Sequence, residues 1–557
     1  MCCSNYSLNK NNMDQLNNYI LLIDSYFGSA AWFPLSLLAT GIFFTFYLGF
    51  PQIRFFRKGW TILGTGGFSG SKGLTSPFQA LSTALSGTVG TGNIGGVAMA
   101  IFIGGPAALF WMWITAFLGM TTKFVEVTLS HKYRKKIGSV GVSGGPMIYM
   151  EEGLNMKWLG YIFAFCLLVS TFGSGNMPQI DNISNTLNSS FGINPLITAV
   201  VMTTLVGLVI IGGINRIASF AASIVPTMAL IYIIGSLSVL IFNYSNILPS
   251  LYIIIHDVFN GTAVVGGFLG ASFSTAFTYG VARGLYSNEA GQGSSPIAHA
   301  TSNTEHSVEE GFVSILEPFI DTIVICTLTG LVILASGVWT EKYQTEFERT
   351  SMYFLSETDS EKPSSDLIDA YKDCRDESEC FSGEIEISQG KLIKNNAIFH
   401  NRSLAEEVFF YQEGILYNGS ISIENGLLAS SNIDVAGKSL VKSAVLTSKA
   451  FNKGFFGNYG EFIVSIGLLL FAFSTMITWS YYGDRCASYL FGEGSVIYYR
   501  IFYLGAIFIA GSGLIDTGII WNFALITVAA STLPNLIAMV LLRKEIKSLL
   551  KDYLSKS

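Results

Sequence analysis

Long apolar segments separated by short polar loops make up most of the chain between residues 29 and 545. A helix that crosses a bilayer needs about 20 mainly apolar residues, and eleven segments meet this requirement. These segments are 29–50, 77–103, 105–130, 158–187, 193–212, 217–242, 263–286, 311–337, 458–482, 496–512 and 518–542. The pattern therefore predicts an all-α membrane protein with eleven transmembrane helices. The first 28 residues are polar and show no secretory signal.

Composition agrees with a membrane protein. Only 13% of the 557 residues are charged, whereas soluble domains usually carry about 25%. The 58 glycines are typical of closely packed membrane helices. Seven cysteines are too few for a disulfide scaffold, and a net charge of -6 argues against binding to nucleic acid. None of the five histidines pairs with a nucleophile or an acid in a recognisable spacing, so we expect no enzyme.

The acidic residues are concentrated in one segment, 341–443. It holds 19 of the 38 acidic and 10 of the 32 basic groups. Alternation in GEIEISQGKLI and YNGSISIENGLL predicts short β-strands there. Cys374 and Cys380 predict a disulfide if this segment lies outside the cell, and a metal site is the weaker alternative. The expected division is an N-terminal segment 1–28, membrane parts 29–340 and 444–545, the acidic insertion 341–443 and a tail 546–557.

Lysine and arginine predict the orientation, because they are enriched in cytoplasmic loops. They cluster after the first span, after the third span and in the tail, whereas 188–192, 243–262 and 513–517 contain none. With eleven spans, the N-terminus and the insertion lie outside and the C-terminus is cytoplasmic.

The second span is unlike a plain lipid-facing helix. Between Ser86 and Gly96 it contains five glycines, three hydroxyl residues and one asparagine. Irregular backbone within a membrane is tolerated only where it lines a cavity. Close helix packing explains the glycines but not Thr88, Thr91 and Asn93, so the sequence favours a broken helix.

The seventh span is interrupted in a similar way, by Gly266, Gly267, Gly270 and Gly280. The two spans would begin two sets of five, spans two to six and seven to eleven, which predicts an inverted repeat (5+5) with a central site. Amide groups at a helix break attract a carboxylate, and carbonyl and hydroxyl oxygens bind a hard cation such as sodium. A zwitterionic amino acid with Na⁺ fits both.

Longer motifs identify a family. The stretch SPFQALSTALSGTVGTGNIGGVAMAIF, together with VSGGPMIYMEEGL, GSGNMPQIDNI, RGLYSNEAGQGSSPIAHA and FAFSTMITWSYYGDRC, resembles the alanine or glycine:cation symporters of bacteria and archaea. The resemblance implies the leucine-transporter fold, with spans two to eleven as its core behind one N-terminal helix. It implies uptake of alanine and/or glycine across the cytoplasmic (inner) membrane, coupled to sodium by alternating access.

The resemblance also implies site residues. The implied substrate-binding residues are Thr91, Gly92, Gly175, Gln179 and Trp479. The implied sodium site consists of Ser86, Val89, Ser474 and Thr475, with a second cation site at Thr88 and Asn93. Sodium is the coupling ion, and no other cofactor is expected.

Several alternatives stay open. Asp321, within a span, is either a cation or proton site or a structural hydrogen-bond partner. Glu126 is expected to form an interfacial salt bridge. Glu289 and His299 are expected to form a helix-capping network, with a gate or hinge as the alternative. A same-fold carrier for another small amino acid, proton coupling, or a transporter-like sensor that uses the insertion are the competing functions. The choice among alanine, glycine, serine and D-alanine, the stoichiometry and the oligomeric state are not predicted.

Overall fold

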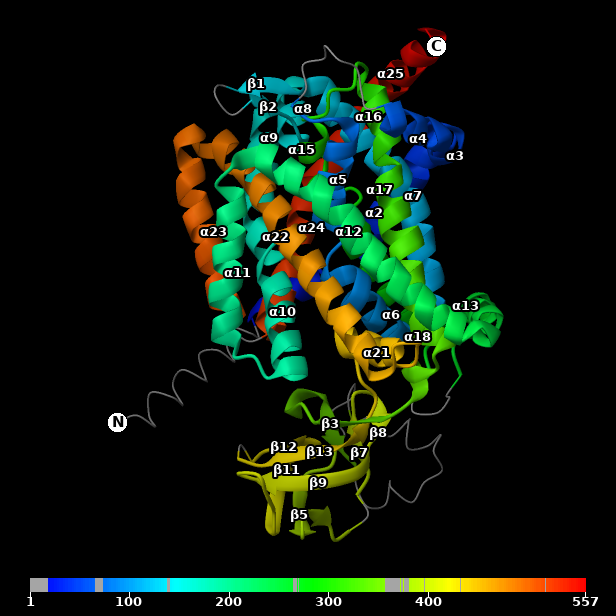
Figure 1. Ribbon diagram of the computed structural model, residues 1–557, viewed down its shortest axis with the longest axis vertical. Coiled ribbons are helices and arrows are strands. Elements are labelled where there is room, and N and C mark those ends of the chain that lie inside the picture. The colour runs from blue at the N-terminus through cyan, green and yellow to red at the C-terminus, as the bar shows by residue number, and fades with distance from the viewer. Residues whose placement is uncertain are drawn as a thin grey trace.

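The protein consists of a helical body and a β-rich insertion (Figure 1). The computed structural model describes residues 19–65, 74–137, 141–263, 268, 270–355, 371, 374, 380–394, 396–430, 432–515 and 517–556. The insertion lies at one end of the body, and the C-terminal helix α25 (Arg543–Lys556) lies at the opposite end.

The body is built from long helices and shorter connecting ones. The long or span-forming helices are α2 (Trp32–Tyr47), α5 (Pro77–Thr88), η1 (Gly92–Gly96), α6 (Val97–Gly104), α7 (Ala107–Tyr133), α9 (Lys157–Gly173), α10 (Met177–Phe191), α11 (Pro195–Ile210), α12 (Gly213–Phe242), α14 (Phe273–Asn288), α16 (Ser307–Ser314), α17 (Leu316–Pro318), η4 (Phe319–Cys326), α18 (Thr327–Ala335), α22 (Gly460–Phe491), α23 (Val496–Gly511) and α24 (Thr517–Leu541). The shorter helices are α3 (Pro51–Arg54), α4 (Phe56–Thr65), α8 (Pro146–Glu152), α13 (Ile247–Asn260), α15 (Pro296–His299) and α21 (Ser443–Asn452).

Seven helices among the described residues are long and apolar enough to cross a membrane, and the bent pair Pro77–Thr88 and Gly92–Gly104 makes an eighth span. These findings confirm a helical, multi-pass body. The helices α2, α11 and α14 lie on three further predicted spans but have 16 residues each. At 1.5 Å per residue they are shorter than a bilayer core of about 30 Å, so the count of eleven stays a prediction.

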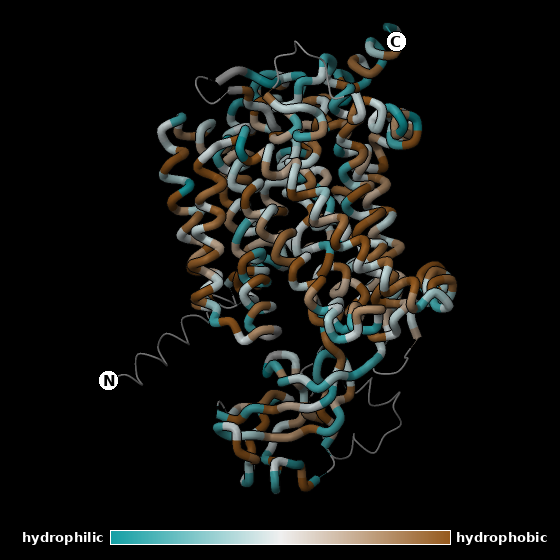
Figure 2. The backbone as a smooth tube through the Cα atoms, viewed as in Figure 1, coloured by the Kyte–Doolittle hydropathy of each residue, from teal (hydrophilic) through white to brown (hydrophobic). Residues whose placement is uncertain are grey.

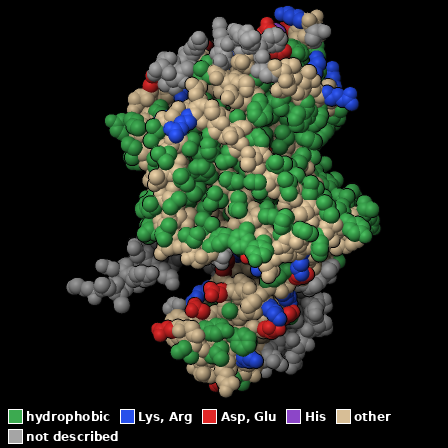
Figure 3. Space-filling model, in the orientation of Figure 1, with side chains coloured by type: hydrophobic (Ala, Val, Ile, Leu, Met, Phe, Trp, Pro, Cys, Tyr) green, Lys and Arg blue, Asp and Glu red, His purple; other side chains and the backbone are tan. Residues whose placement is uncertain are grey.

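Hydropathy is distributed as a membrane body requires. The hydrophobic residues follow the helices through the middle of the body, whereas hydrophilic residues gather at its two ends and in the insertion (Figure 2). The visible surface shows the same hydrophobic belt, with most lysine, arginine and acidic side chains beyond it (Figure 3). Apolar surface of this extent on the outside is stable in contact with lipid.

The insertion forms small antiparallel sheets, as the alternating sequence predicts. Its strands are β3 (Tyr343–Glu346), β4 (Met352–Phe354), β5 (Gly383–Ser388), β6 (Lys391–Leu392), β7 (Ile398–His400), β8 (Ser403–Leu404), β9 (Glu406–Gln412), β10 (Ile415–Leu416), β11 (Gly419–Glu424), β12 (Leu427–Leu428) and β13 (Asp434–Ser439). The sheet orders are β10-β9-β13-β3, β12-β11-β5-β6 and β4-β7-β8. A separate hairpin pairs β1 (Lys135–Ile137) with β2 (Gly141–Ser143) in the body. A disulfide joins Cys374 to Cys380.

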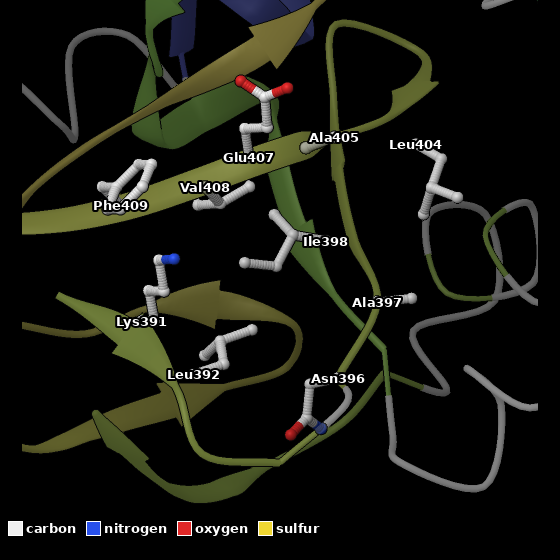
Figure 4. Close-up of a pocket in the computed structure, with 10 residues that line it drawn as sticks. All are labelled: Lys391, Leu392, Asn396, Ala397, Ile398, Leu404, Ala405, Glu407, Val408 and Phe409. Atoms are coloured by element: carbon white, nitrogen blue, oxygen red, sulfur yellow. The ribbon is translucent and has the colours of Figure 1, made fainter. Parts of the chain in front are cut away.

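A pocket of about 690 Å³ opens between strands of the insertion (Figure 4). Ile398 and Val408 contribute apolar lining, and Lys391 and Glu407 contribute charges. The ammonium group of Lys391 lies 5.1 Å from the centre of the Phe409 ring. The pocket therefore belongs to the insertion and is separate from the helical body.

Candidate functional site

The second predicted span is broken. Helix α5 ends at Thr88, the π-helical segment η1 begins at Gly92, and the two halves are bent by 56°. Between them, Val89 leaves the helical conformation with a ψ of 95°. This confirms the break that the glycines and threonines predict, and we call residues 89–91 the first break.

The backbone of the first break bonds to neutral side chains. The Gly90 amide donates to Asn93 Oδ1 at 2.9 Å, and the Thr91 amide donates to Gln179 Oε1 at 3.3 Å. The Thr475 hydroxyl donates to the Val89 carbonyl at 3.3 Å. Gly90 is required sterically, because a Cβ there would lie 2.9 Å from the Thr475 hydroxyl oxygen.

Oxygen atoms of α5 and α22 meet directly beside the first break. The Ser86 hydroxyl donates to the Ser474 carbonyl at 3.0 Å, and the Ser474 hydroxyl donates to the Ser86 carbonyl at 3.3 Å. Together with Val89 and Thr475, these are the four residues that the family resemblance assigns to sodium, and the structure brings them together. Thr478, which the sequence did not indicate, donates to Ser86 Oγ at 3.0 Å.

The residues implied for substrate binding lie in and beside the first break, on η1, α22 and the α9–α10 junction. Thr91 Oγ1 and Trp479 Nε1 are buried and have no hydrogen-bond partner among the residues that the structure describes. Gly175 lies between α9 and α10 against α22, where a Cβ would be 2.5 Å from Trp479 Cβ. A Cβ at Gly92 would be 3.2 Å from the Tyr286 ring. Buried polar atoms without partners are costly unless a ligand or water pairs with them.

Asn93 connects η1 to a second π-helical segment, η4. Its amide nitrogen donates to Asp321 Oδ1 at 2.6 Å and to Ser287 Oγ at 3.1 Å. The hydroxyls of Ser287 and Thr322 each donate to Asp321 Oδ2 at 2.7 Å. π-Helical turns are rare and are frequent at functional sites, so this fully buried carboxylate belongs to the neighbourhood of the first break.

The structure does not join Thr88 to this carboxylate cluster. The Thr88 hydroxyl lies 3.4 Å from the Ala84 carbonyl of its own helix. The sequence did not indicate Ser287 or Thr322 as site residues, although Ser287 lies within RGLYSNEAGQGSSPIAHA and Thr322 directly follows Asp321. A hydroxyl residue next to a motif does not indicate a binding site from the sequence alone. Only the fold shows that it contacts Asp321.

The seventh span differs from its prediction. Gly280 does not interrupt it, because α14 is continuous from Phe273 to Asn288. A Cβ at Gly280 would overlap the Ala108 carbonyl, so this glycine lets α14 approach α7. Gly270 lies before α14 with a positive φ of 84°. Gly266 and Gly267 lie outside the described residues.

Residues 270–272 at the start of the predicted span are not helical, and a further irregular stretch follows α14. Glu289, Gly291 and Gly293 all have positive φ, of 52°, 87° and 79°. We call residues 289–295, between α14 and α15, the second break. Its position near the end of the body that carries α25 can be followed in Figure 1. From the sequence, these residues are predicted to form a turn with a helix-capping network.

Charged side chains surround the second break. The Gly291 amide donates to Glu126 Oε1 at 3.3 Å, and the Asn535 amide nitrogen donates to Glu126 Oε2 and to the Gly291 carbonyl, each at 2.9 Å. Glu126 is fully buried and lies 3.7 Å from Lys123, so it forms its salt bridge inside the body and not at the membrane interface as expected. Burial in the body, which depends on α24, could not be read from the sequence around Glu126.

Lys123 is the principal cation of this region and was not indicated by the sequence analysis. Its ammonium group, with no exposed side-chain surface, lies 3.0 Å from Glu317 Oε1 and 2.5 Å from Ser295 Oγ. His299 Nδ1 lies 2.6 Å from Glu310 Oε1. A single lysine within a long apolar segment does not by itself indicate a functional site. Its role becomes visible only when the structure shows that Glu317 and Ser295, from other segments, surround it.

Comparison with known proteins identifies the class. The model of the sodium:alanine symporter family matches residues 13–360 and 426–557. An uncharacterized transporter of Haemophilus influenzae is 35% identical over 545 residues, covering 97% of each chain. The sodium/alanine symporter AgcS of Methanococcus maripaludis is 34% identical over 526 residues, covering 92% of this chain and 93% of that protein. The probable sodium/glutamine symporter GlnT of Bacillus subtilis is 41% identical over 303 residues, 54% of this chain and 62% of that protein.

The helical body and these matches define a multi-pass secondary membrane transporter, not an enzyme. The chain belongs to the sodium:alanine symporter family, whose general activity is cation-coupled symport of amino acids. The family model leaves residues 361–425 unmatched, and these lie in the β-rich insertion.

Proposed function

We propose that this carrier takes up a small neutral amino acid, alanine and/or glycine, together with sodium by alternating access. The observation that carries the proposal is the first break, a bent and buried stretch of backbone that lies directly beside a group of carbonyl and hydroxyl oxygens. A relative named as a sodium/alanine symporter supports the choice of ion and substrate.

The proposed sodium ligands are the carbonyl oxygens of Ser86 and Val89 and the hydroxyl oxygens of Ser474 and Thr475. The hydrogen bonds between α5 and α22 keep these oxygens adjacent. Neutral oxygen ligands suit a hard monovalent cation. Ion binding would therefore join α5 to α22 at the first break.

The proposed substrate carboxylate binds to the amides of Thr91 and Gly92, at the start of η1, where the helix dipole favours a negative charge. Gln179 now accepts from the Thr91 amide, so it would turn toward the substrate when the carboxylate binds. Gly175 and Trp479, which pack against each other, would limit the substrate side chain. A small amino acid is the expected fit.

Asn93 and Asp321 form the proposed second cation or proton site. Thr88, at the end of α5, stays a weaker candidate for it, because its hydroxyl lies near its own helix. Asp321 now accepts three hydrogen bonds from neutral donors. A cation would displace some of these donors, whereas a proton would make one carboxyl oxygen a donor, so that a neighbouring hydroxyl would have to accept from it.

The proposed architecture has eleven spans, with spans two to eleven as a 5+5 inverted repeat. α2, α11 and α14 supply the three spans that are too short to pass on length alone. The insertion 341–443 would lie outside the cell and α25 in the cytoplasm, which agrees with their places at opposite ends of the body (Figure 1). The N-terminus would be outside, in an inner-membrane protein of bacterial type.

The test is sodium-dependent uptake of labelled alanine into proteoliposomes. Thr475→Ala and Asn93→Ala should each raise the sodium concentration for half-maximal uptake at least tenfold, about 1.4 kcal/mol. Thr204→Ala is the control, because this exposed threonine bonds only to Val200 of its own helix among the described contacts. Uptake that is unaffected by removing sodium would overturn sodium coupling. Unchanged sodium dependence in both variants would overturn the assigned site.

A further inference from the structure

The second break is held by three other parts of the chain. Glu126 of α7 accepts from the Gly291 amide, Asn535 of α24 donates to the Gly291 carbonyl, and Ser295 bonds to Lys123 and Glu317. Segment 289–295 is therefore bonded at both its middle and its end, although its own conformation is irregular.

Lys123, Ser295 and Glu317 form a closed triangle. The Lys123 ammonium group donates to Ser295 Oγ at 2.5 Å and to Glu317 Oε1 at 3.0 Å, and Ser295 Oγ donates to Glu317 Oε2 at 3.1 Å. Lys123 Nζ also lies 3.7 Å from Glu126 Oε1. Because these side chains are fully buried, each charge depends on the others, and separating them without water would be unfavourable.

The triangle is connected to the proposed site along one short path. Glu317 lies four residues, about one turn, before Asp321, whose carboxylate bonds to Asn93 beside the first break. On the other side, Ser287 bonds to Asp321 and immediately precedes the end of α14 and the second break. A displacement of segment 289–295 would therefore disturb the surroundings of Asp321 and Asn93.

We propose that Lys123 and Glu317 are positioning residues of the transport cycle, which hold the second break against α7 and separate the site from the end of the body that carries α25. The triangle opens in the state that releases substrate toward that end. This inference rests on the proposed function. It adds a reason for the charges, because a purely structural contact between these helices would need none.

The variants must remove both partners of the Lys123–Glu317 ion pair together. Glu126, 3.7 Å from Lys123, and His299, 3.5 Å from Glu317, stay in place. Lys123→Met combined with Glu317→Gln removes the ion pair and retains similar side-chain volumes. The matched control is Asp484→Asn with Arg500→Met. That pair also joins two helices of the body, α22 and α23, through a buried carboxylate at 2.6 Å, and it makes no described contact with the second break.

Cys326 is a natural reporter. Its buried sulfur lies 3.2 Å from Ser287 Oγ and 3.4 Å from Asn93 Nδ2, so it should become accessible when the second break moves away. Cys486, also buried, is the internal reference. The purified carriers are treated with N-ethylmaleimide, and peptide mass spectrometry measures the labelling rate of each cysteine separately.

In the Lys123→Met/Glu317→Gln variant, Cys326 should be labelled at least fivefold faster than in the unchanged protein. The labelling rate of Cys486 should stay within twofold of its rate in the unchanged protein. Sodium affinity for alanine uptake should stay within threefold while the maximal rate falls. The Asp484→Asn/Arg500→Met control should label like the unchanged protein. Ser295→Ala, which keeps both charges, should give a smaller rise at Cys326, about twofold, and serves if the double variant does not fold.

Unchanged Cys326 labelling in the folded variants, or an equal rise at Cys326 and Cys486, would overturn the inference, because either outcome leaves the triangle with a structural role only. Absence of sodium-dependent uptake by the unchanged protein would instead overturn the proposed function. The labelling rates do not depend on that measurement, so the two failures can be told apart.

Discussion

The two helix breaks are alike in backbone and opposite in chemistry. Both are buried, glycine-containing stretches that follow a regular helix. The first break bonds to neutral groups of Asn93, Gln179 and Thr475. The second break bonds to Glu126 and is closed by the Lys123–Glu317 ion pair.

Because of this difference, the first break has polar groups that can bind a ligand, whereas the charged groups at the second break are already paired with one another. At the first break, Thr91 Oγ1 is buried without a partner among the described residues, and neutral amides can exchange one acceptor for another at small cost. At the second break, the charges satisfy one another, so opening it requires a change in several partners together. We therefore expect substitutions at the first break to alter the binding of ion or substrate, and those at the second break to alter stability, conformation and the maximal rate of transport.

The largest effect is expected for Lys123→Met alone. It removes the nearest cation of the buried Glu317 carboxylate and leaves His299 Nε2 at 3.5 Å as its remaining basic neighbour, which should destabilise the carrier by about 3 kcal/mol. Thermal unfolding in detergent would show the loss, and the added Glu317→Gln should restore most of it. A single variant as stable as the unchanged protein would remove the contrast between the two breaks.

Gly90→Ala tests the first break by adding a methyl group, whereas Lys123→Met removes a charge at the second break. The new Cβ would lie 2.9 Å from the Thr475 hydroxyl oxygen and 3.2 Å from Gln179 Oε1. Overpacking of this kind costs about 1–3 kcal/mol of folding stability, so thermal stability should fall modestly. Displacement of Thr475 and Gln179 should also lower uptake at low alanine concentration by about tenfold. Gly505→Ala is the control, because its Cβ would meet nothing within 4 Å. Normal uptake by Gly90→Ala would show that the first break tolerates bulk.

Asn535→Ala tests the second break by removing neutral hydrogen bonds while every charge is kept. It removes the bonds to Glu126 and to the Gly291 carbonyl and the acceptor of the Tyr149 hydroxyl. The expected loss of stability is about 1–3 kcal/mol, with sodium affinity within twofold of normal. Asn182→Ala, which loses one bond to Pro178, is the control for both measurements. A selective loss of sodium affinity would mean that the second break contributes to ion binding.

Thr478→Val should have the smallest effect. Its hydroxyl bonds to Ser86 Oγ, next to the proposed sodium ligands but not among them. Loss of one such bond is worth about 0.5–1.5 kcal/mol, so half-maximal uptake should need about threefold more sodium. Thr204→Val is the matched control. A change above tenfold would place Thr478 among the ligands.

The sequence predicted the first break because its signal was doubled. Glycines alone would have fitted close packing, but Thr88, Thr91 and Asn93 added polar groups where lipid-facing helix has no use for them. The seventh span also combines glycines with hydroxyl residues, but its Ser272 caps the start of α14 by accepting from the Thr275 amide. Its Gly280 is a packing residue against Ala108, and the stretch that breaks, 289–295, lies beyond the apolar segment in which a break was sought.

The apolar pattern by itself determined the membrane body, the alternating pattern determined strands in the insertion, and the motifs indicated the family. These features are local, since each follows from the order of apolar and polar residues along a short stretch. The tertiary structure alone decided which charges are paired. Lys123, Ser295 and Glu317 come from separate segments, and their interaction depends on distances that no local pattern records. The same applies to Asn93 and Asp321, where two π-helical turns far apart in the sequence bring an amide and a carboxylate to 2.6 Å.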